Sequence, residues 1–118
     1  MKFSILSACA AIFMLSAGAQ AEMECKAPFE PDIPVRFETE EQLMAVYAEV
    51  KDFIQVKSPE YLSCLDALRA QVDPDAEDSD AQIASIDQRN NDNVDAQRAV
   101  KNRFDAAYKI WKVEHPKE

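Results

Sequence analysis

The three cysteines, Cys9, Cys25 and Cys64, carry the most versatile chemistry in this chain. A cysteine can serve as a reactive thiol, as a metal ligand or as half of a disulfide bond. The sequence contains no Cys-x-x-Cys pair, which a thioredoxin-like redox role requires. The single histidine, His115, is far from every cysteine in sequence, so no Cys/His zinc spacing exists. A disulfide therefore remains the main interpretation, provided that the chain reaches an oxidising compartment.

The first residues predict such a compartment. Lys2 precedes the apolar run FSILSACAAIFMLSAGA, and AQA at 19–21 matches the small-x-small pattern of a cleavage site. We therefore expect residues 1–21 to be a signal peptide that carries the protein to the periplasm or the exterior, with no stable membrane anchor. An alternative is that LSAC at 6–9 is a lipoprotein box, but the apolar region before Cys9 is very short. After cleavage, Cys25 and Cys64 would remain and form a disulfide bond.

An acidic stretch, DPDAEDSD at 73–80, is the best candidate for cation chemistry. Its carboxylates belong to Asp73, Asp75, Glu77, Asp78 and Asp80. Calcium prefers oxygen ligands of this kind. However, an EF-hand loop that starts at Asp73 would need glycine at Asp78 and glutamate at Ala84. We expect at most weak cation association here, and no metal site is assigned.

The rest of the sequence argues against an enzyme. His115 lies near the C-terminal end, where a general base is poorly held, and the serines have no recognisable His-Asp context. The single glycine, Gly18, lies in the leader, so the remaining chain has no phosphate-cradling glycine loop, and we expect no cofactor. The net charge of −9 argues against nucleic acid and anionic membrane surfaces as partners.

The elements that would position these residues are predicted to be helical. Prolines at 28, 31 and 34 exclude a helix from residues 22–37, which we expect to form an extended strap. Its expected anchors on the domain are Phe29, Ile33 and Phe37.

Thr39 with Gln42 three residues later predicts the start of the first helix, and apolar residues then recur at helical spacing. Pro59 is expected to break or kink this helix, because proline has no amide hydrogen to donate. The pattern resumes as a second helix through Val72, and residues 73–80 form a turn. A third helix, free of proline and glycine, is predicted from about Asp75 to Val113.

These lengths predict an all-α fold: an elongated antiparallel helical hairpin in which two helices in series pack on one long helix, with coiled-coil-like pairing and an N-terminal proline-containing strap. Residues 38–113 would form the helical domain and residues 114–118 a frayed end. In this register Asn90, Asn91 and Asn93 lie opposite the break at Pro59, where one amide could donate to the free carbonyl of Gln55. Glu38, Glu40 and Glu41 would lie near Lys109 and Lys112.

The strings CKAPFEPDIP, TEEQL and YLSCL resemble those of an uncharacterised group of small exported helical proteins of Gram-negative bacteria. The resemblance covers roughly residues 25 to 65. It implies a bacterial, exported, non-enzymatic module, and it carries no activity and no functional residue.

We therefore predict a structural or protein-binding role in the periplasm, with ligand or cation binding through the acidic turn as the alternative. Phe104, Tyr108 and Trp111 form an aromatic stripe at helical spacing on the third helix. The stripe would be core, or a surface for a protein partner or a second copy, since a two-helix hairpin leaves one flank open. Trp111 is expected to be mostly buried near Phe37.

Overall fold

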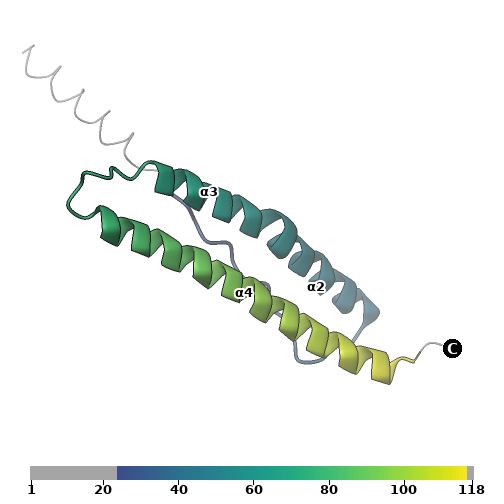
Figure 1. Ribbon diagram of the computed structural model, residues 1–118. Helices are drawn as coiled ribbons and strands as arrows, with labels where there is room; N and C mark the ends of the chain where they lie inside the picture. The colour runs from purple at the N-terminus through teal and green to yellow at the C-terminus, as the bar shows by residue number, and fades with distance from the viewer. Residues whose placement is uncertain (1–23, 117–118) are drawn as a thin grey trace, which may run out of the picture.

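The computed structural model describes residues 24–116, which contain helices and connecting segments and no strand in that range (Figure 1). The elements are α2 (Glu40–Asp52), η1 (Phe53–Lys57), α3 (Ser58–Ala70) and α4 (Ser79–Glu114). The predicted all-helical class and elongated shape are confirmed. The predicted signal peptide at 1–21, with Cys9, lies outside the described residues. None of the helices in the described part is long and apolar enough to span a membrane.

Helix α2 begins where the sequence predicts, because Thr39 and Gln42 satisfy free backbone amides at its start. The Thr39 hydroxyl accepts a hydrogen bond from the backbone N–H of Gln42 at 3.0 Å. The Gln42 side chain accepts one from the N–H of Glu38 at 2.8 Å. Glu40 and Glu41 place negative charge in the first turn, where the helix dipole is positive.

Of the two outcomes predicted at Pro59, a break or a kink, the break is wrong, because the helix passes through this point as a π-helical turn. Residues Phe53–Lys57 form this turn, and the N–H of Ser58 donates to the carbonyl of Phe53, five residues back. Pro59 then occupies the first turn of α3, where its missing N–H costs least. The wider turn therefore accommodates the proline without interrupting the run of helix.

Asn93 is the asparagine that is buried against this turn, with 6% of its surface exposed. Its amide donates to the hydroxyl of the fully buried Ser58 at 3.2 Å, and its carbonyl accepts from the Gln97 amide at 2.8 Å. The expected partner, the carbonyl of Gln55, is thus replaced by Ser58. Among residues 24–116, no buried side-chain nitrogen or oxygen lacks a hydrogen-bond partner.

Helix α4 lies beside both α2 and α3 (Figure 1). It starts at Ser79, later than predicted, because residues 73–79 form consecutive turns in which Ala76 bonds to Asp73 and Ser79 to Ala76. Side-chain pairs between the helices run in opposite numerical directions: Arg69 with Asp87, Ser58 with Asn93 and Tyr47 with Phe104.

Two apolar clusters fill the seam between these helices. The larger one lies between α2 and α4, and its buried members are Phe37, Leu43, Val46, Val50, Phe53, Val100 and Ala107. The smaller one lies between α3 and α4, and its buried members are Cys25, Tyr61, Leu65 and Ile86. Because each cluster includes a residue that precedes α2, the N-terminal segment (residues 24–37) contributes to both.

The N-terminal segment is extended and runs alongside the helices (Figure 1). Cys25 forms the predicted disulfide with Cys64 of α3, with their Cα atoms 5.6 Å apart. At the other end Phe37 is 1% exposed, and Ile33 is partly buried. Phe29, predicted to be an anchor, is 96% exposed, so this prediction is wrong.

Arginines of α4 and of the segment make the remaining attachments. Arg89 donates to the carbonyl of Cys25 and to the hydroxyl of Tyr61. Arg103 pairs with Glu30 at 2.9 Å, and Arg36 pairs with Glu114 at 2.6 Å. The sequence predicted that Glu38, Glu40 and Glu41 lie near Lys109 and Lys112. In the described structure, no ion pair forms between these glutamates and these lysines.

Candidate functional site

An apolar hollow on the described surface lies between α2 and α4. We call it the aromatic groove; it has a volume of about 340 Å³, and its lining residues are Leu43, Met44, Tyr47, Phe104 and Tyr108. Phe104 is partly buried against the larger core cluster, with its ring centroid 5.8 Å from that of Tyr47 and 6.0 Å from that of Tyr108. The rings thus form a continuous apolar surface that is open on one side.

Helical spacing explains why these side chains share one side of the helices. Met44 and Tyr47 are three residues apart on α2, and Phe104 and Tyr108 are four apart on α4, so each pair occupies one helix face. The neighbouring positions Val46 and Val50 turn inward and are buried in the seam. The groove residues therefore stand at the edge of the core.

This edge is unusually exposed for large apolar side chains. Met44 is 57% exposed, Tyr47 47% and Tyr108 39%. Along α4, Val94 is 38% exposed about four helical turns before Tyr108. Neighbouring apolar side chains at this level of exposure are typical of a binding surface, whereas isolated ones are common on any protein.

The end of the groove carries opposite charges on its two edges. On the α2 edge, a shallow hollow beside Met44 is lined by Glu40 and Glu41. On the α4 edge, the ammonium group of Lys112 lies 5.1 Å from the centre of the Tyr108 ring, which is a cation–π distance. A ligand at this end therefore meets an acidic side and a basic side.

Of the three residues of the predicted aromatic stripe, Phe104, Tyr108 and Trp111, only the first two line the groove. Phe104 and Tyr108 line the groove together, with nearly parallel rings at an angle of 13°. Trp111 is partly buried at the end of the larger core cluster, and its outer face stacks on His115 at 3.6 Å. Trp111 therefore lines a separate hollow, of about 260 Å³, with Tyr108, Lys112 and His115.

Met44 and Tyr47 are the groove residues that sequence reasoning missed as a surface. Both carry the helical spacing of the core, and Tyr47 in particular belongs to the same apolar series as Val46 and Val50. The exposure of the side of α2 that carries them depends on the path of the N-terminal segment, which the sequence does not give.

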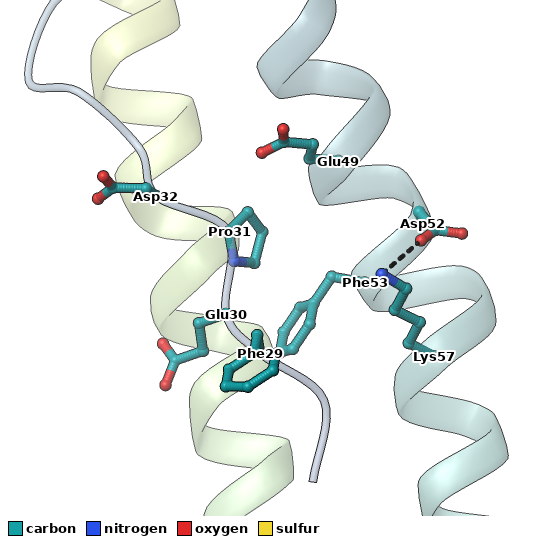
Figure 2. Close-up of a pocket in the computed structure, with 8 residues that line it drawn as sticks. All are labelled: Phe29, Glu30, Pro31, Asp32, Glu49, Asp52, Phe53 and Lys57. Carbon is teal, nitrogen blue, oxygen red and sulfur yellow. Dashed lines mark ion pairs between the residues drawn. The ribbon is translucent and has the colours of Figure 1, made fainter.

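A second hollow lies on the side that the N-terminal segment crosses (Figure 2). It has a volume of about 300 Å³, and its lining residues are Phe29, Glu30, Pro31, Asp32, Glu49, Asp52, Phe53 and Lys57. Figure 2 shows the ring of Phe29, from the segment, beside the ring of Phe53, and both line this hollow. Two of its four carboxylates are paired, Glu30 with Arg103 and Asp52 with Lys57.

The acidic turn does not assemble into a cation site. All five of its carboxylate side chains are exposed. Asp73 uses one carboxylate oxygen to accept the backbone N–H of Asp75 at 2.9 Å, which stabilises the turn. Within residues 24–116, no three His, Cys, Asp or Glu side chains come together in a way that could hold a metal ion.

The disulfide and Arg89 attach the start of the N-terminal segment to α3 and α4. Arg89 was not singled out by sequence reasoning, since an arginine in a polar stretch of helix gives no local signal of its partners. In the structure its guanidinium carbon lies 5.8 Å from the centre of the Tyr61 ring. It therefore joins the N-terminal segment, α3 and α4 at one point, next to Cys25.

Comparison of the chain with protein-family models, with curated proteins and with solved structures found no match.

Proposed function

We propose that this is an exported, non-enzymatic protein that binds another protein chain through the aromatic groove. The observation that carries the proposal is the exposure of Met44, Tyr47 and Tyr108 around a common hollow. Aromatic and methionine side chains are enriched in protein interfaces because they bury a large apolar area at a small cost in conformational entropy.

We propose further that the binding unit is the elongated antiparallel hairpin of α2 and α3 with α4, with the N-terminal segment acting as its strap. Three attachments support this role: the Cys25–Cys64 disulfide, the bonds of Arg89 and the buried Phe37. A strap that covers one side of a two-helix layer leaves the other side for a partner.

The proposed location is the periplasm. It is supported by the signal-peptide pattern at 1–21 and by the Cys25–Cys64 disulfide, since disulfides persist in oxidising compartments. A structural or binding role agrees with the chemistry of the groove, which is lined by apolar and aromatic groups and has its charges at one end.

The test is site-specific crosslinking in the native envelope. A photo-crosslinking amino acid is placed at Tyr47, in the groove, and in a matched variant at Asp66, an exposed position on α3. We expect discrete adducts from position 47 and few from position 66. The same adducts from both positions, or none from position 47, would contradict the proposal.

A further inference from the structure

We propose that the partner in the aromatic groove is a second copy of this chain, which packs in parallel so that α2 of each copy lies against α4 of the other. This inference rests on the proposed function, and it specifies the partner. It is carried by the shape of the groove together with the distribution of charge at its end.

The groove has the shape that a twofold contact requires. In such a contact the same patch is used on both copies, so it must offer protruding side chains as well as a hollow to receive them. Met44 and Tyr47 protrude on the α2 edge, while Phe104 lies recessed between the edges. A second groove turned to face the first can therefore place its α2 edge over the recessed rings of its neighbour.

The charges select the orientation of the two copies. Glu40 and Glu41 lie on the α2 edge at the helix N-terminus, and Lys112 lies on the α4 edge in the last turn of that helix. A twofold axis parallel to the helices brings the α2 edge of one copy onto the α4 edge of the other at the same end of the molecule. The two glutamates then meet Lys112 of the second copy, and the opposite ends of the helix dipoles also meet.

The resulting assembly is a four-helix bundle. Each α2 has an antiparallel α4 as a neighbour within its own copy and another across the interface, which is the usual arrangement of such bundles. Farther from the charged end, Val94, which is 38% exposed, lies on the same side of α4 and also faces the second copy. Lys101, between these regions, is already paired with Asp105 at 2.9 Å.

A charge exchange tests both the partner and the orientation. The first variant carries Glu40→Lys and Glu41→Lys, and the second carries Lys109→Glu and Lys112→Glu. The control variant, Glu60→Lys with Asp66→Lys, reverses two exposed acids on α3, away from the groove. The dimer dissociation constant of protein purified from the periplasm is measured by sedimentation at a series of concentrations, and thermal unfolding confirms that each variant is folded.

We expect the parent protein and the control to dimerise with similar affinity. Each of the two groove variants should weaken its own dimer about tenfold or more, because like charges then face each other across the interface. An equimolar mixture of the two should form a heterodimer of near-parent affinity, since every lysine again faces a glutamate. This rescue is specific to the α2-on-α4 orientation.

A parent protein that stays monomeric at every concentration overturns the inference. If its position-47 adducts in the envelope contain a different protein, the proposed function survives and only the second copy is excluded. A parent dimer that both charge variants leave unchanged, or a mixture with no rescue, also overturns the α2-on-α4 contact. A further check is Tyr108→Glu, which alters a partly exposed side chain of the groove; this variant, once thermal unfolding shows that it is folded, should also be a monomer.

Discussion

The buried hydrogen bond between Asn93 and Ser58 is expected to stabilise the seam at the π-helical turn. Replacing Asn93 with alanine removes two hydrogen bonds, one to Ser58 and one from Gln97. Each is worth about 1 kcal/mol net, and the Ser58 hydroxyl, which is fully buried, would lose its side-chain partner at a further cost of about 1 kcal/mol or more. Alanine recovers about 0.6 kcal/mol of helix propensity. We therefore expect Asn93→Ala to lower the free energy of unfolding by about 2–3 kcal/mol.

The matched control is Asn91→Ala, two residues away on the same helix and exposed to solvent. It should gain only the propensity difference and raise the free energy of unfolding slightly, by about 0.5 kcal/mol. The assay is urea unfolding followed by far-UV circular dichroism, with the denaturant slope compared between variants so that a change in compactness is not read as a change in stability.

A double-mutant cycle isolates the bond itself. If the two side chains interact, Asn93→Ala together with Ser58→Ala should cost about 1 kcal/mol less than the sum of the single changes. Effects that add to within about 0.3 kcal/mol would show that the two groups do not interact, and would refute the reasoning. An Asn93→Ala variant as stable as Asn91→Ala would refute it as well.

Three further predictions concern the attachments of the N-terminal segment. Replacing Cys25 and Cys64 with serine should lower the free energy of unfolding by about 4 kcal/mol, since the bond closes a loop with a sequence separation of 39; an unchanged melting temperature on reduction would contradict this. Phe37→Ala should cost about 3–5 kcal/mol in urea unfolding and Phe29→Ala less than about 0.5, because Phe37 is 1% exposed and Phe29 96%; equal costs would contradict the burial. Arg89→Gln should speed proteolysis of the segment severalfold by releasing the Cys25 carbonyl and Tyr61, and an unchanged digestion rate would argue against this attachment.

Local signals in the sequence predicted the helical class, the start of α2 and the disulfide. The Thr39 and Gln42 pair acts within a single turn, so its effect does not depend on the rest of the fold. The pairing of Cys25 with Cys64 followed from the count of cysteines and the expected compartment. Of the asparagines expected opposite Pro59, Asn93 does lie there and bonds to the neighbouring Ser58, whereas Asn91 is exposed.

The contacts across the molecule could not be predicted in the same way. The sequence marks Phe29 and Phe37 as equivalent anchors, yet an extended segment shows only one side to the helices, and its path decides which ring is buried. Likewise, proline predicts the loss of one hydrogen bond, whereas the choice between a broken helix and a continuous π-helical turn depends on the packing around it.

Burial in the aromatic groove was decided by the tertiary structure alone. Periodicity places Met44, Tyr47 and Val46 on the apolar half of one helix, but this half is wider than the seam that one partner helix can cover. The N-terminal segment crosses only one side of that seam, so Val46 is buried while Met44 and Tyr47 are exposed. A side chain's place on its helix is thus a local property of the sequence, whereas its exposure depends on which distant segment packs beside it.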